Sequence, residues 1–214
     1  MKEKSKRIFF HLVWLFIIGC FLGFIFETIY YFIKNGIWIN KQGLLYGPFK
    51  PIYGCGLVLI TACLANFKKG KSPVWIFVGG VVIGTFFEYF ASYFQEIVFG
   101  TYTWTYSSFN LNLNGRIYLP YCFMWGVISF IWMKYGYKLY LKCFNKLYSK
   151  KFEIVTYIVA ALMIINIILT SLVTYRFSER SVSAIASNKL EEKLDIYYPD
   201  DVVKKKFPKL RVYK

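Results

Sequence analysis

The chain alternates between long apolar segments and short, strongly charged ones. Five apolar segments lie between the charges, at about 8–33, 51–67, 73–95, 117–133 and 154–175. A membrane-spanning helix needs about 20 consecutive apolar residues, which the first, third and fifth segments provide outright. The pattern predicts an all-α membrane protein with about five transmembrane helices in a domain over residues 1–175, and an amphipathic, charged C-terminal tail over residues 176–214.

A nine-residue motif occurs twice in these apolar segments. Residues 19–27 read GCFLGFIFE and residues 80–88 read GVVIGTFFE, 61 positions apart. A second pattern, Gly-x2-Tyr-x-Pro-x5-Gly, follows each motif, at 43–54 and again at 115–126, 72 positions apart. Matching internal spacing at two places in each copy indicates an internal duplication.

The two copies predict two helix pairs. The offset grows from 61 to 72 because the second copy carries an 11-residue insertion after Gln95. Each copy contributes two spans, so the copies run parallel through the membrane, as some transporter repeats do. We predict repeat one at about 8–67 and repeat two at about 73–133, with a fifth span at about 154–175 that packs outside them.

Each motif places two glycines and one acid along one stripe of a helix. Positions i, i+4 and i+8 advance by about 40° each on an α-helix, so the three residues share a face. Small residues on such a stripe let a second backbone approach closely. The predicted helix-packing residues are Gly19, Gly23, Gly80 and Gly84. The acids, Glu27 and Glu88, then point at a helix interface rather than at lipid.

A carboxylate inside a membrane helix is costly, so it indicates a partner or a function. We predict that Glu27 or Glu88 meets Lys50 or Arg116, the bases at the start of the two short spans, across the repeat interface. One interpretation is a structural ion pair that locks the helix pairs together. The other is a proton, cation or substrate site. The candidate substrate- or ion-binding residues are Glu27, Glu88, Lys50, Arg116, Tyr46 and Tyr118.

Proline and glycine mark the start of both short spans. Pro48 and Pro51 precede the second apolar segment, and Pro120 lies early in the fourth. Two short, Gly/Pro-interrupted segments at matching places in two repeats are typical of a transporter binding site, where broken helices expose backbone dipoles. Alternatively, proline simply begins each helix, where its missing donor costs little.

Basic residues predict the orientation. Thirteen lie in the amino-terminal stretch, the second loop (Lys68, Lys69 and Lys71 among them) and the fourth loop, against four in the first and third loops. The positive-inside rule then places the N-terminus in the cytoplasm and, after five spans, the C-terminus outside. The net charge of +16 lies mostly beside apolar spans. It indicates the lipid bilayer, with anionic headgroups, as a partner rather than nucleic acid.

Other candidate chemistry is sparse. Residues 17–20, Ile-Ile-Gly-Cys, resemble a lipoprotein signal, but the apolar run continues past Cys20 and its glycine matches the second motif, so we expect no cleavage. The five cysteines form no C-x-x-C pair, and the single histidine, His11, has no other ligand types nearby. We expect no metal site and no cofactor.

Two polar regions carry their own patterns. Residues 99–115 alternate aromatic or apolar with polar residues, with Tyr102, Trp104 and Tyr106 before Asn114-Gly115. This favours a short extended hairpin over the outer mouth, or else an interfacial aromatic belt. In the tail, apolar residues at helical spacing predict a surface amphipathic helix over residues 178–194, and a second helix start falls at Asp200.

The runs GFIFETIY at 23–30 and GLLYGPFKPIYGCG at 43–56 resemble the family of ABC-transporter type IV, or CmpB-like, permeases of bacteria, with similarity from about Gly19 to Gly126. The resemblance implies a multi-pass permease or transport-system subunit in the bacterial cell membrane. The chain has no G-x4-G-K-[ST] phosphate loop, so an ATPase would be a separate subunit. Five spans are few for a permease, which points to a homo-oligomer or a second membrane subunit.

Two other classes remain open from the residues alone. A non-catalytic accessory or scaffold protein would use the repeats for packing and the tail for docking. An intramembrane enzyme acting on a lipid-linked substrate would use the two carboxylates as acid and base. No nucleophile or metal accompanies those carboxylates, so we expect no enzyme and assign no catalytic residue.

Overall fold

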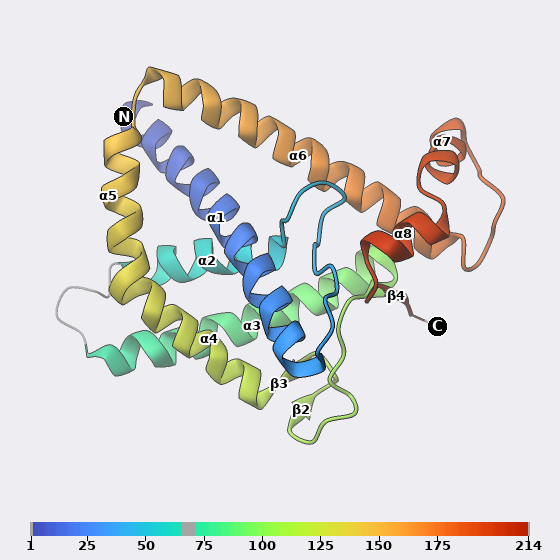
Figure 1. Ribbon diagram of the computed structural model, residues 1–214, viewed down its shortest axis with the longest axis horizontal. Helices are drawn as coiled ribbons and strands as arrows, with labels where there is room; N and C mark the ends of the chain where they lie inside the picture. Colours follow the sequence, from blue (N-terminus) through green and yellow to red (C-terminus); the bar gives the residue numbers. More distant parts are fainter. Residues whose placement is uncertain (1, 66–71, 214) are drawn as a thin grey trace.

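The computed structural model describes residues 2–65 and 72–213, which are mostly helical (Figure 1). Three of the basic residues that predict the orientation, Lys68, Lys69 and Lys71, lie outside the described residues, as does the last part of the predicted repeat one. The orientation in the membrane therefore stays a prediction.

Within residues 2–65 and 72–213, three helices are long and apolar enough to cross a membrane: α1 (Lys2–Asn35), α3 (Pro73–Phe99) and α6 (Lys150–Glu179). A fourth apolar helix, α2 (Pro51–Leu64), has 14 residues and is about 21 Å long at 1.5 Å per residue. These helices confirm a mostly helical chain with segments suited to a membrane. The count of five spans stays a prediction.

The short helices pack beside the long ones. Helix α2 lies along α1, and α4 (Leu119–Ile131) lies along α3 (Figure 1). Pro51 and Pro120 occupy the first turns of α2 and α4. There the missing proline donor leaves no hydrogen bond unmade, so proline begins each helix. The prediction that proline interrupts these helices is wrong.

Helix α4 does not end at the edge of an apolar segment. A π-helical segment (Trp132–Gly136) joins it to α5 (Tyr137–Leu147). The predicted fourth loop is therefore helical over most of its length. Its apolar side packs on the start of α1, where the His11 ring stacks on Phe144 with centroids 3.7 Å apart. Tertiary packing of this amphipathic face explains why a lysine-rich segment stays helical.

Helix α6 joins both long helices at its ends (Figure 1). Near its start, Trp14 Nε1 of α1 donates to Thr156 Oγ1 at 2.9 Å, and Lys6 pairs with Glu153. Near its end, Ser178 Oγ donates to the carbonyl of Gly100, just after α3, at 3.3 Å. The C-terminal ends of α1, α3 and α6 therefore lie toward the loops 36–50 and 100–118. We call this side the loop face.

The loop after α3 contributes strands to two small antiparallel pairs. Strand β2 (Asn112–Leu113) pairs with β3 (Ile117–Tyr118) around Asn114 and Gly115, whose φ angles are +54° and +68°. Two consecutive positive φ values are those of the Asn-Gly hairpin turn. The predicted hairpin is present, but its first strand begins at Asn112, well after the start of the alternating pattern at Tyr102. Strand β1 (Thr101–Tyr102) pairs instead with β4 (Arg211–Val212) in the tail.

The tail folds back onto the loop face. Helix α6 ends at Glu179, and the next helices are α7 (Lys189–Tyr197) and α8 (Asp200–Lys206). The predicted helix over 178–194 is wrong, because residues 180–188 form turns. The predicted start at Asp200 is confirmed.

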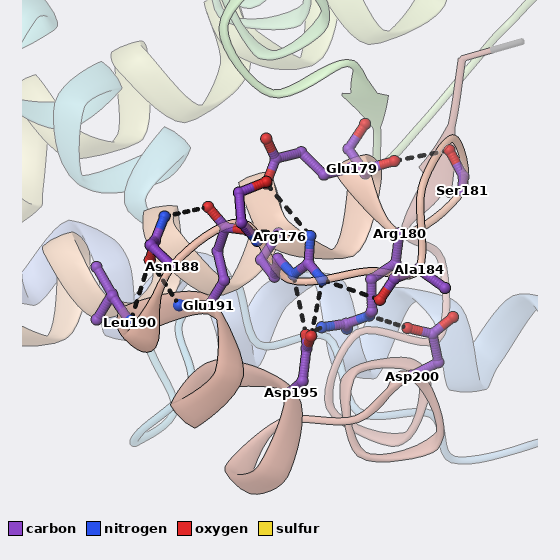
Figure 2. Close-up of polar contacts among 12 residues, drawn as sticks. Arg176, Glu179, Arg180, Ser181, Ala184, Asn188, Leu190, Glu191, Asp195 and Asp200 are labelled. Atoms are coloured by element: carbon purple, nitrogen blue, oxygen red, sulfur yellow. Dashed lines mark hydrogen bonds and ion pairs between the residues drawn. The ribbon is translucent and has the colours of Figure 1, made fainter.

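Two arginines hold the tail in place, Arg176 in the last turn of α6 and Arg180 directly after that helix (Figure 2). Arg176 donates to Asp195 through Nε at 3.0 Å and through Nη2 at 2.7 Å, and Arg180 Nε donates to Asp200 at 2.7 Å. Beneath these pairs lies a cluster of buried apolar residues from α6, the tail and the first loop: Leu45, Val173, Phe177, Leu194, Val203, Phe207 and Leu210. The tail is a packed part of the fold.

Candidate functional site

The first helix pair meets through glycine. A Cβ placed on Gly19 would lie 2.7 Å from the carbonyl oxygen of Tyr53 and 2.9 Å from Cα of Gly54. A Cβ on Gly23 would overlap the Tyr53 side chain. Both predicted packing glycines of α1 therefore face α2, where the backbones approach too closely for a larger residue.

The second helix pair makes the corresponding contacts. A Cβ on Gly80 would overlap the Ser129 side chain and lie 3.1 Å from the carbonyl oxygen of Trp125, and a Cβ on Gly84 would overlap the Trp125 side chain. Trp125 lies 72 positions after Tyr53, the same offset that separates the two copies of the Gly-x2-Tyr-x-Pro-x5-Gly pattern. The side chains that cover the glycines thus occupy matching places in the two pairs.

Tyr53 and Trp125 also meet each other between the pairs. Their ring centroids are 5.8 Å apart and the planes are tilted by 30°. The Tyr53 hydroxyl is within electrostatic range of both Glu27 and Glu88, and the two carboxylates are within electrostatic range of each other. The two motifs therefore bring both acids to one place, close to a pair of aromatic rings. We call this place the central site.

Glu27 is bound by two lysines. Lys50 donates to Glu27 Oε2, and Lys41 Nζ lies 3.7 Å from Glu27 Oε1. Both lysine side chains are 9% exposed, against 24% for the glutamate. The pair Glu27–Lys50 was predicted, but it forms within one helix pair. Lys41 was not predicted to contact Glu27. It lies in the 36–50 loop just before the Gly-x2-Tyr-x-Pro-x5-Gly pattern, and this closeness to the repeated pattern is the sequence signal that could have identified it.

Glu88 has a different environment. It is 6% exposed and accepts hydrogen bonds from Trp125 Nε1 at 2.8 Å and from the Tyr106 hydroxyl at 3.0 Å. Within the described residues, no basic group lies within 4.0 Å of this carboxylate. The sequence explains the difference, because the position 72 residues after Lys50 is Cys122.

Arg116 does not reach either acid of the motifs. Its guanidinium pairs with Glu96 near the end of α3, and its Nη1 donates to Ser92 Oγ at 3.3 Å. The prediction that Arg116 is a counter-charge of Glu27 or Glu88 is wrong. Its place just after the hairpin turn carries it toward the last turns of α3, where Glu96 is the nearer acid. Arg116 therefore fastens the 100–118 loop to the end of α3.

The two candidate tyrosines lie at the loop face. Tyr46 is 55% exposed, and its hydroxyl is 2.8 Å from that of Tyr198 in the tail. Tyr118 packs among aromatic rings, 5.0 Å from Phe109 and 5.3 Å from Tyr121 between centroids. Neither hydroxyl contacts an acid of the central site in the described structure. Tyr106, which does contact Glu88, was marked in the sequence only as part of the alternating loop.

Electrostatics differ between the two loops. Burial, the Glu88 carboxylate and the hydrogen bond to it raise the pKa of Tyr106 well above its usual range, so this phenol stays a donor. Burial lowers the pKa of Lys41, Glu27 raises it, and the ammonium groups of Lys50 and Lys209 lower it further. The 36–50 loop therefore holds a partly buried positive charge at a cost in desolvation, whereas the 100–118 loop supplies a neutral donor, the Tyr106 hydroxyl.

Fold and site together define a class: a helical protein with apolar helices long enough for a membrane and ionisable groups buried between them. The chain belongs to the family described as "Putative ABC-transporter type IV", whose model matches residues 14–171. That range includes both motifs and both short helices, and it confirms the resemblance found in the sequence. Curated proteins and solved structures give no match.

Proposed function

We propose that the chain is the membrane subunit of a transport system and that the central site, with Glu88 as its exchangeable acid, is where a substrate or ion binds. The observation that carries the proposal is the unequal environment of the two acids. Glu27 is bound by two lysines, whereas Glu88 is buried with neutral donors only. A buried carboxylate without a counter-ion is suited to take up a proton or a cation.

The surrounding residues suit this role. Trp125 and Tyr106 orient the Glu88 carboxylate from the helix and from the loop, so its two oxygens are held by different elements. Tyr106 belongs to the 100–118 loop, and a movement of that loop would remove one of the two donors. Access to the carboxylate is thereby coupled to the loop face.

The family supports a transport role with an ATPase as a separate partner, since the chain has no phosphate loop of its own. The three long apolar helices support the lipid bilayer as the environment. We further propose a homo-oligomer in the bacterial cell membrane, with five spans, the basic N-terminal end in the cytoplasm and the loop face outside. Purification from membranes in mild detergent would identify a bound ATPase by mass spectrometry.

The test uses Glu88→Gln. A glutamine keeps the size of the side chain and both neighbours, because its oxygen can accept from Trp125 and its amide can donate to the Tyr106 hydroxyl. A strain lacking the gene is compared with wild type for solute uptake and growth on a broad panel of solutes. Any difference is then complemented with wild type, Glu88→Gln, or the control Glu192→Gln on the exposed side of α7.

We expect Glu88→Gln to reach the membrane at wild-type abundance and to fail in complementation, while Glu192→Gln complements fully. Complementation by Glu88→Gln would contradict the proposal, because an exchangeable acid cannot be replaced by an amide. Loss of the protein from the membrane would instead assign Glu88 a structural role.

A further inference from the structure

Two ammonium groups lie beside a single carboxylate in the first helix pair, and a third lies against the neighbouring Tyr31 ring. Lys50 and Lys41 both lie within ion-pair distance of Glu27. Lys41 Nζ lies 3.9 Å from the centre of the Tyr31 ring, and Lys209 Nζ from the tail lies 5.3 Å from the centre of the same ring. Lys209 also interacts electrostatically with Lys41. These residues bring together the end of α1, the first loop, the start of α2 and the tail.

The charges in this cluster do not balance. Glu27 neutralises one lysine, which leaves one excess charge on the two buried ammonium groups and a second on the exposed Lys209. Among the described residues, the ion pair of Lys41 is with Glu27. A buried charge without a counter-ion is strongly destabilising. The Tyr31 ring offsets only part of this cost.

The backbone adds positive potential at the same place. Lys50 is the residue before α2, and no side chain caps the first turn of that helix. Pro51 has no N–H and the Tyr53 N–H donates to the Lys50 carbonyl at 3.1 Å, so the positive potential at this helix start comes mainly from the aligned peptide dipoles, which attract anions. The Glu27 side chain is 24% exposed, so this part of the structure is not fully enclosed by the protein.

We propose that Lys41, Lys50 and the start of α2 form a binding site for a phosphate group. This inference rests on the proposed function and names a class of ligand for the first helix pair. Lys41 and Lys50 hold an anionic group, while Glu88 in the second pair carries the proton or cation. The phosphate would come from a solute or from a lipid headgroup. Glu27 then acts as the internal anion that competes with the ligand for the two lysines.

Lys41→Met is the decisive variant. It leaves Glu27 and Lys50 as a balanced pair, so the protein is expected to fold, and it removes the excess charge that attracts the ligand. The matched control is Lys205→Met, which removes an exposed lysine of α8 that forms no ion pair with any residue the structure describes. Full-length protein in phosphatidylcholine nanodiscs is titrated with inorganic phosphate by calorimetry, against chloride at matched ionic strength.

We expect phosphate to bind wild type and Lys205→Met equally, and Lys41→Met about tenfold more weakly or not at all, because one opposite charge near the ligand is gone. Glu27→Gln should bind phosphate about tenfold more tightly, since the competing anion is removed. Phosphate should also raise the melting temperature of Glu27→Gln more than that of wild type. A purely structural role for the lysines would produce neither gain.

A lipid source is tested in the same variants. If phosphate alone does not bind, nanodiscs with phosphatidylglycerol are analysed by native mass spectrometry, and retention of that lipid by wild type but not by Lys41→Met assigns the site to a headgroup. Equal binding by wild type and Lys41→Met in both assays, or weaker binding by Glu27→Gln, would overturn the proposal. These readouts need no transport, so they fail independently of the complementation by Glu88→Gln.

Discussion

The two helix pairs share their packing and differ in their charge. In both pairs a long helix presents two glycines to an aromatic residue of a short helix, Tyr53 in the first pair and Trp125 in the second. One turn beyond each glycine stripe stands a glutamate. Glu27 is bound by lysines and Glu88 by neutral donors. The contact that fixes the backbone is therefore the same in both pairs, while the side chains around the acids give each pair its own chemistry.

Replacing each acid by its amide should separate the pairs most strongly. Glu27→Gln leaves two buried lysines without an anion and should lower the free energy of unfolding by about 2–3 kcal/mol. Glu88→Gln keeps both of its hydrogen bonds and should cost less than about 1 kcal/mol. Chemical or thermal unfolding in detergent micelles measures both. Equal losses would show that the lysines do not depend on Glu27.

The sequence predicts what helix geometry determines. Spacing by four residues places Gly19, Gly23 and Glu27 on one face of a helix. Lys50 lies directly before a helix that starts with proline, and its side chain reaches that face. The offset of 72 also pairs Tyr53 with Trp125. Such relations are local, because helix period and proline position fix them before any tertiary contact forms.

The parts that could not be predicted depend on how loops close. Arg116 is at the edge of a hairpin whose register decides which acid it meets, and the register places it beside Glu96. Tyr106 reaches Glu88 only because its loop folds over the second pair. The helix expected over 178–194 ends early because the tail turns back to place Asp195 against Arg176. These outcomes depend on long-range contacts that local propensity does not record.

Glycine substitutions test whether the shared packing is energetically shared. Gly23→Ala and Gly84→Ala each place a methyl group against the inner atoms of an aromatic side chain, and each should cost about 1–3 kcal/mol of stability. Gly79→Ala is the matched control on α3. A Cβ there would lie 2.8 Å from a terminal methyl of Leu64, which can rotate away. Thermal unfolding should group the first two variants apart from the third.

Unequal losses of stability in Gly23→Ala and Gly84→Ala would contradict the conclusion that the two helix pairs share their packing. If Gly23→Ala were neutral and Gly84→Ala were not, the first pair would be held by its ion pairs rather than by close backbone approach. Combining Gly23→Ala with Glu27→Gln would then show coupling, since neighbouring groups that share a contact do not add.

The tail provides the smallest and most local test, because it holds the loop of the first pair and not the hairpin of the second. Leu45 N–H donates to Thr170 Oγ1 at 3.0 Å beside the apolar cluster that the tail completes. The hydrogen bonds from Arg176 and Arg180 hold the pKa of Asp195 below its usual range. Because the folded-state pKa is lowered, the stabilisation is complete above about 3.9 and is lost as the pH falls through the lowered value.

Asp195→Asn should therefore weaken tail docking by about 1–2 kcal/mol at pH 5, and its effect should shrink as the pH falls through the lowered pKa of Asp195, where wild type loses the same charge. Hydrogen–deuterium exchange, corrected for pH, should show faster exchange in α7 and in residues 37–50 of the variant at pH 5. Residues 112–118 should exchange as in wild type at that pH, because Asn112–Tyr118 form their hairpin without the tail. Faster exchange in residues 112–118 as well would mean that the tail supports the two pairs alike, and the contrast between a first loop held by the tail and a hairpin closed by its own residues would fail.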